Sequence, residues 1–134
     1  MRSNRVGALL ADNFGSFSVL NAQGVSLASN GNVTIGTQAG TSFIVRRVVI
    51  SNANKDISTA NVTIFTSPDG AAANLIAGKA QLSNVSSTST YQDLTLNANC
   101  ATKVYTTGCI MVTVANAVSG GSCDINVYGD IVVN

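Results

Sequence analysis

Hydrophobic and polar residues alternate with a period of two along several short segments of the chain. This pattern is typical of antiparallel β-strands that have one face in a core and the other in solvent. The clearest example is segment 124–133, in which the apolar and polar positions fall on opposite faces: Ile125, Val127, Ile131 and Val133 against Asp124, Asn126, Tyr128 and Asp130. Gly129 falls on the apolar face, which predicts a β-bulge or the close approach of another strand.

Shorter segments repeat the pattern and are separated by turn-forming residues. Their predicted inward-facing residues are Val62 and Ile64, Leu94 and Leu96, and Ile110, Val112 and Val114. Asn30-Gly31 predicts a hairpin between 25–27 and 33–35, and segment 67–70 predicts a tight turn. A helix-like apolar pattern occurs only over 71–80, where Gly78 interrupts it. We therefore predict an all-β fold, an antiparallel β-sandwich of about eight strands with little helix.

Segment 43–50 departs from simple alternation because it is apolar on both faces around Arg46 and Arg47. Regular alternation puts one arginine on each face, as in a strand that is covered on both sides. A β-bulge near the pair would instead turn one of them outward. At an intersubunit surface, such arginines can bind partner carboxylates through two hydrogen bonds. The alternative is a pair of ordinary surface arginines.

Length and composition favour one β domain. A chain of 134 residues can bury one self-sufficient core. All of its acidic residues are Asp, and it is rich in Val, Thr, Ser and Asn, which suit strands and turns better than helices. We predict a single β-sandwich domain over 1–134, in which 1–32 supply the first strands and an N-terminal arm that carries Arg2 and Arg5.

The charge pattern argues against nucleic acid and membrane partners. Charged residues make up 10% of the chain and the formal net charge is +1, so no strong field gathers phosphate or anionic lipid. No run of about 20 apolar residues is present to span a bilayer. Arg2 and Arg5 precede a short apolar stretch that Asp12 ends, which is too brief for a signal peptide. These features predict synthesis in the cytoplasm.

The residues for common catalytic chemistry are missing. The chain has no histidine, which excludes Ser-His-Asp and Cys-His arrangements and His-based zinc sites within the chain. We expect no catalytic residue, no bound cofactor and no metal. Cys100, Cys109 and Cys123 lack metal-ligand spacing, and their odd number favours buried thiols. A bridge between Cys100 and Cys109 is the alternative, should a hairpin bring them together.

Three segments carry a resemblance to a known group of proteins: Phe43-Ile44-Val45-Arg46-Arg47-Val48, Tyr91-Gln92-Asp93-Leu94-Thr95-Leu96 and Val127-Tyr128-Gly129-Asp130. Over residues 41–134 the chain resembles small jelly-roll-like virion proteins of tailed bacteriophages, of the capsid decoration or cement type. The resemblance implies a structural protein on the outer capsid surface that stabilises contacts between capsomers and is made in the bacterial cytoplasm. It implies no enzyme activity.

The partners that the resemblance implies are the major capsid protein and further copies of this chain in a homotrimer, with no nucleic acid, membrane or small-molecule substrate. The candidate interface residues are Arg2, Arg5, Arg46, Arg47, Tyr91 and Tyr128. The alternative function is a phage tail or fibre component, or a β-sandwich module that binds host carbohydrate. Sugar-binding sites generally use aromatic platforms, and this chain has no Trp and three Tyr.

Overall fold

Eight β-strands and two short 3-10 helices form the computed structural model, which describes residues 17–36, 42–66, 71–106 and 110–132. The strands are β1 (Phe17–Ser26), β2 (Gly31–Thr34), β3 (Ser42–Ser51), β4 (Asn61–Phe65), β5 (Leu75–Gln81), β6 (Tyr91–Asp93), β7 (Met111–Ala115) and β8 (Ser122–Val132). The 3-10 helices are η1 (Ala72–Asn74) and η2 (Ala98–Ala101). No α-helix occurs in these ranges, and none of their helices is long and apolar enough to cross a membrane.

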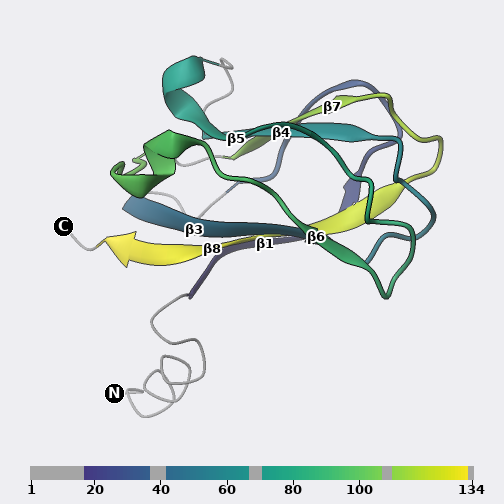
Figure 1. Ribbon diagram of the computed structural model, residues 1–134, viewed down its shortest axis with the longest axis horizontal. Coiled ribbons are helices and arrows are strands. Elements are labelled where there is room, and N and C mark those ends of the chain that lie inside the picture. The colour runs from purple at the N-terminus through teal and green to yellow at the C-terminus, as the bar shows by residue number, and fades with distance from the viewer. Residues whose placement is uncertain (1–16, 37–41, 67–70, 107–109, 133–134) are drawn as a thin grey trace, which may run out of the picture.

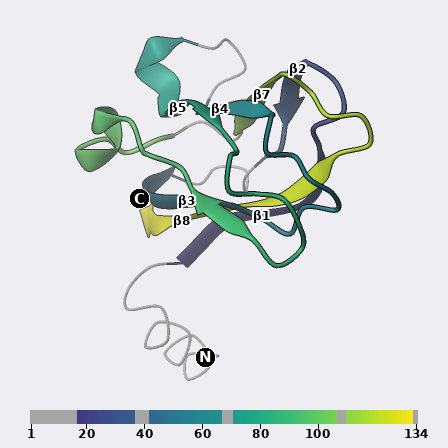
Figure 2. The same cartoon turned by 45° about the vertical axis from the view of Figure 1, so that its right-hand side comes forward.

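The strands form two four-stranded sheets, ordered β1-β8-β3-β6 and β2-β7-β4-β5, that stack face to face (Figures 1 and 2). All of the pairs are antiparallel, and they are nested: β1 with β8, β2 with β7, β3 with β6 and β4 with β5. Nested pairing of eight strands across two sheets is the arrangement of a jelly roll. The predicted all-β, jelly-roll-like sandwich is confirmed.

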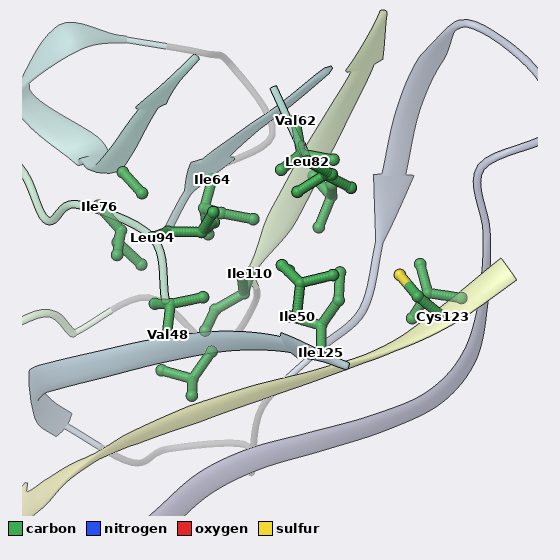
Figure 3. Close-up of a cluster of buried hydrophobic side chains, with 14 of the residues drawn as sticks. Val48, Ile50, Val62, Ile64, Ile76, Leu82, Leu94, Ile110, Cys123 and Ile125 are labelled. Atoms are coloured by element: carbon green, nitrogen blue, oxygen red, sulfur yellow. The ribbon is translucent and has the colours of Figure 1, made fainter. Parts of the chain in front are cut away.

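Apolar side chains from both sheets meet in the space between them (Figure 3). The predicted inward residues Val62, Ile64, Ile110, Val112 and Val114 are buried, as is Leu94. Burial also alternates along β8, where Cys123, Ile125, Val127 and Gly129 are buried. Ile131 continues that face but is 39% exposed, because it lies at the end of the strand. Val133 lies outside the described residues.

The predicted hairpin at Asn30-Gly31 is wrong. β1 pairs with β8 in one sheet and β2 pairs with β7 in the other, so the connection between β1 and β2 crosses the sandwich. The main chain of Leu27 bonds to Gly121 and Val118 instead, with N···O distances of 2.9 and 3.0 Å. Pairing with distant segments therefore overrides the local turn signal. The helix-like pattern over 71–80 forms only η1 before β5 begins, and the turn predicted at 67–70 lies outside the described residues.

A β-bulge in β3 explains the irregular pattern around the two arginines. Val45 is opposite Gly129 and Arg47 is opposite Tyr128, so Arg46 is an extra residue in the ladder. The inserted residue shifts the alternation by one position, and both arginines are exposed. The bulge interpretation is confirmed, whereas the regular strand with one arginine on each face is wrong.

The cysteines that the structure describes are free. Cys100 and Cys123 are both buried thiols, while Cys109 lies outside the described residues. The Sγ of Cys100 lies 3.3 Å from the hydroxyl oxygen of Tyr105. Of the predicted N-terminal region 1–32, the first sixteen residues are outside the described ranges and the remainder forms β1 and the start of β2.

Candidate functional site

The outer face of the β1-β8-β3-β6 sheet, which faces away from the other sheet, brings together the predicted interface residues that the structure describes. Residues directly opposite each other in an antiparallel pair point to the same side of the sheet. Arg47 is opposite Tyr128, and both lie on this outer face. Ser51 is opposite Tyr91 on one side and Asp124 on the other, which places a second outward row along the same sheet.

Arg47 is held on this face by a carboxylate on the neighbouring strand. Its Nε donates to Oδ1 of Asp93, and its Nη2 donates to Oδ2 over 3.1 Å. The side-chain hydrogen bond with Asp93 raises the pKa of Arg47, with smaller contributions from Tyr128 and Tyr91 and opposition from desolvation. The guanidinium is therefore charged at every pH at which proteins fold, and its plane is fixed by two bonds.

Arg46 is held in the same way from the other side of β3. Its Nε and Nη2 both reach Oδ2 of Asp130 on β8, at 3.0 Å each. The two arginine side chains are 53% and 52% exposed, so each ion pair contributes about 0.2–1 kcal/mol at most to stability. The main effect of the two pairs is to orient the arginines on an open surface.

Four of the six candidate interface residues therefore share one sheet face. Arg46, Arg47 and Tyr128 are neighbours on β3 and β8, while Tyr91 on β6 is 59% exposed. Arg2 and Arg5 lie outside the described residues. Composition favours an interface here, since arginine and tyrosine are enriched in the energetically important parts of protein interfaces.

The surface continues past Arg46 into a region that sequence reasoning missed. A hollow of about 190 Å³ is lined by Ile44, Arg46, Ala101, Thr102, Lys103 and Val104. Val104 is 43% exposed, and Lys103 donates a hydrogen bond to the carbonyl of Ala73 and lies 5.3 Å from the ring centroid of Tyr105. No alternation or turn signal marks segment 98–104, because η2 and the residues after it are irregular. The name arginine face is used below for Arg46, Arg47, Tyr91, Tyr128 and the residues that line this hollow.

A second hollow, of about 420 Å³, lies at the opposite end of the same sheet. It is lined by Gln23, Gly24, Asn52, Asn54, Thr88, Ser122 and Asp124. Within this lining, Oδ1 of Asp124 accepts a hydrogen bond from the backbone N of Gly24 over 3.0 Å, and Oδ2 accepts one from Nδ2 of Asn52 over 2.9 Å. The sequence placed Asp124 on a polar face, but the loop residues around it come from distant parts of the chain.

Two groups in the core, the Cys123 thiol and the Tyr105 hydroxyl, have raised pKa values. Burial raises the pKa of Cys123 to about 12, which keeps its thiol protonated and unreactive at neutral pH. Burial, together with the hydrogen bond to Cys100, also raises the pKa of Tyr105. Within the described residues, no group of three or more His, Cys, Asp or Glu side chains is arranged to hold a metal ion.

Comparison with known proteins adds little to this geometry. The chain matches no protein-family model and no curated protein. Among solved structures it is similar to a chain of "Structure of infectious bursal disease virus Gx strain", with 14% identity and a TM-score of 0.35. The match covers 84% of this chain and 31% of that chain, so this protein corresponds to less than a third of its length. A similarity this low carries no argument, and the jelly-roll assignment rests on the strand order.

Proposed function

We propose that this protein is a structural virion protein of the capsid decoration or cement type, which binds the outer surface of a capsid through its arginine face. Its partners in this proposal are the major capsid protein and further copies of itself in a homotrimer. It is made in the cytoplasm of a bacterial host and acts on the surface of the virion. The role requires no catalytic residue and no cofactor.

The observation that carries the proposal is the convergence of Arg46, Arg47, Tyr91 and Tyr128 on one sheet face. A jelly roll alone does not decide the function, because capsid and lectin domains share it. The function is therefore inferred from the residues on the surface. Asp93 and Asp130 keep both arginines in fixed orientations before any partner arrives, which lowers the entropy lost on binding.

Both signs of charge alternate across this face, and the partner surface is expected to match them. Each arginine is paired with an aspartate within the sheet. A partner carboxylate could extend each pair into a three-group network, and a partner cation could bind the aspartates. Such charge patterns select partners and register more than they add raw affinity.

The first experiment measures cosedimentation of the purified protein with capsids that lack their decoration protein. The Arg46→Ala, Arg47→Ala double variant is expected to bind at least about tenfold more weakly, because truncating an arginine that is an interface hot spot costs about 2 kcal/mol or more. Circular dichroism should show an unchanged β spectrum. The matched control is the Lys55→Ala, Lys79→Ala double variant, which removes the same charge from exposed positions elsewhere.

The outcomes separate clearly. Loss of binding in the arginine variant alone supports the proposal, and equal binding by both variants contradicts the assignment of the arginine face. Failure of the unaltered protein to bind any capsid contradicts the cement function itself. Sedimentation equilibrium tests the expected homotrimer, and a monomer across the micromolar range would contradict that part.

A further inference from the structure

The polar hollow around Asp124 has the size and construction of a ligand site, and the proposed function does not use it. Its volume of about 420 Å³ lies in the range of roughly 300–1,000 Å³ that small-ligand sites occupy. Segments that are far apart in the sequence build it, since Gln23 and Gly24 come from β1, Thr88 from the loop before β6, and Asp124 from β8.

The groups that line the hollow are fixed by hydrogen bonds before a ligand arrives. Asp124 is held by Gly24 and Asn52. Asn54 donates from Nδ2 to the carbonyl of Gly120 over 2.8 Å, and its Oδ1 accepts from the backbone N of Ser122 over 2.8 Å. A preorganised wall loses little entropy when it binds.

The backbone of the hollow is left-handed at two lining positions, of which only the non-glycine position is costly. Gly24 has φ of 64° and Asn52 has φ of 53°. A left-handed conformation is uncommon outside glycine and is concentrated at ligand sites, where the surrounding structure holds it in place. In Asn52 this conformation brings the side-chain amide to the carboxylate of Asp124.

The chemistry of the wall selects an uncharged ligand rich in hydroxyl groups. The lining side chains offer amides, hydroxyls and one carboxylate, and none of them is cationic. A sugar hydroxyl both donates and accepts, so it can pair with a carboxylate and an amide at once. An anionic ligand would meet the charge of Asp124 without a lining cation to offset it.

Tyr91 supplies the apolar surface that a sugar ring needs beside such a polar wall. It lies in one row with Ser51 and Asp124, two strand spacings from Asp124, or about 10 Å. Its side chain is 59% exposed, and an exposed aromatic ring can pack against the C–H face of a pyranose. The spacing suits a ligand with one sugar unit in the hollow and the next on Tyr91.

We propose that this hollow and Tyr91 form a binding site for an uncharged oligosaccharide. The inference goes beyond the proposed cement function. The sugar site shares Tyr91 with the arginine face, whereas Gln23, Thr88 and Asp124 are not part of that face. A virion surface protein that also binds glycan would attach the particle to a saccharide-coated surface.

Binding is tested with the full chain on a glycan array and by titrating ¹⁵N-labelled protein with maltose, cellobiose, lactose and chitobiose at millimolar concentrations. Binding is expected on the array, and the amide signals of Gly24, Asn52 and Asp124 should shift with at least one disaccharide. Shifts confined to another part of the protein overturn the proposal. So does the absence of binding in both experiments.

Variants identify the contacts. Gln23→Ala and Thr88→Ala are each expected to weaken binding about five- to tenfold, which is the loss of one hydrogen bond to a ligand. Tyr91→Ala should weaken it at least about tenfold, while Tyr91→Phe keeps the ring and should retain binding within about twofold. The matched control is Thr34→Ala, on an exposed position of the opposite sheet. Equal losses in Thr34→Ala and Thr88→Ala would overturn the site.

The two proposals fail separately. The Arg46→Ala, Arg47→Ala variant should still bind glycan, and the Thr88→Ala variant should still cosediment with capsids. Loss of glycan binding in the arginine variant would overturn the assignment of the sugar site to the hollow. Loss of capsid binding in Thr88→Ala would place the capsid contact at the hollow and overturn the arginine face.

Discussion

Gly129 and Ile44 lie on neighbouring strands so close together that a Cβ built on Gly129 would stand 1.7 Å from the carbonyl oxygen of Ile44. The contact is with backbone and lies beside the β3 bulge, where Val45 is opposite Gly129. A side chain cannot be accommodated here by a rotamer change, so the two central strands would have to separate. Gly129→Ala is expected to lower the free energy of unfolding by at least about 3 kcal/mol, measured by urea denaturation.

Gly78→Ala is the matched control for this prediction. Gly78 also lies in a strand, but a Cβ there meets nothing within 4 Å. Alanine at this position should leave stability unchanged or raise it by up to about 1 kcal/mol, because it restricts the unfolded chain. Similar losses in both variants would show that the close approach to Ile44 is not the cause.

The bulge makes a second prediction about β3. Deletion of Arg46 leaves Val45 followed directly by Arg47, which restores regular alternation and keeps Phe43 and Val45 facing inward. This deletion should lower the free energy of unfolding by less than about 2 kcal/mol, whereas deletion of Val49 turns one half of the strand over and should lower it by more than about 4 kcal/mol. Urea denaturation of both variants measures the difference, and equal losses would contradict the assigned bulge.

Stability is expected to fall at alkaline pH because of two buried groups. The pKa of Cys123 is about 12 in the folded protein against 9.0 for an ordinary thiol, and burial raises the pKa of Tyr105 above 10.0. The unfolded chain therefore loses these protons first. The stabilisation is fully present below about pH 9 and is lost as the pH rises toward 12.

The measurement is the urea midpoint between about pH 7 and about pH 11, over which the free energy of unfolding should fall by a few kcal/mol. Cys123→Ala removes one of the two groups and should show a shallower loss above pH 9 than the unaltered protein. Identical pH profiles would exclude Cys123 as a source of the effect.

The ion pair between Arg47 and Asp93 should matter little for stability. A double-mutant cycle of Arg47→Ala and Asp93→Ala is expected to give a coupling energy of about 0.2–1 kcal/mol, which falls as salt is added. Both side chains are about half exposed, so water screens the pair. A coupling above about 2 kcal/mol would show that the pair supports the fold rather than presenting Arg47 to a partner.

The sequence predicted the sandwich because its signals are local. Alternation in β4, β7 and β8 identified most of the side chains that face the core, since one face of each strand meets it. The exceptions are Ile131, which is exposed at the end of β8, and Met111, which is buried on the other face of β7. The turn signal at Asn30-Gly31 predicted a hairpin that does not form, and the reason is physical. A turn signal reports where the chain reverses, whereas the partner of each strand is chosen by packing, and β2 pairs with β7 across the sandwich.

The surface was predictable only in part. Arg46 and Arg47 were recognisable because they interrupt an apolar strand. The sequence was compatible with a regular strand or with a β-bulge, and the register of β3 against β8 shows the bulge. The hollow around Asp124 carries no sequence signal, because its lining residues become neighbours only when β1, β8 and two loops are in place. The exposure of Val104 was not predicted, because residues in an irregular segment do not follow a periodic pattern of apolar and polar positions.

The pairing of β1 with β8 has a kinetic consequence. Phe17 is opposite Gly129, and β8 lies between β1 and β3 in the sheet. During synthesis, the ribosome must therefore release β8 before this strand can insert between β1 and β3. Until then, the strands made earlier leave their apolar faces exposed to solvent. Folding of such a non-local topology is slow, on the order of milliseconds to seconds. The strands that are not yet paired are candidates for chaperone binding.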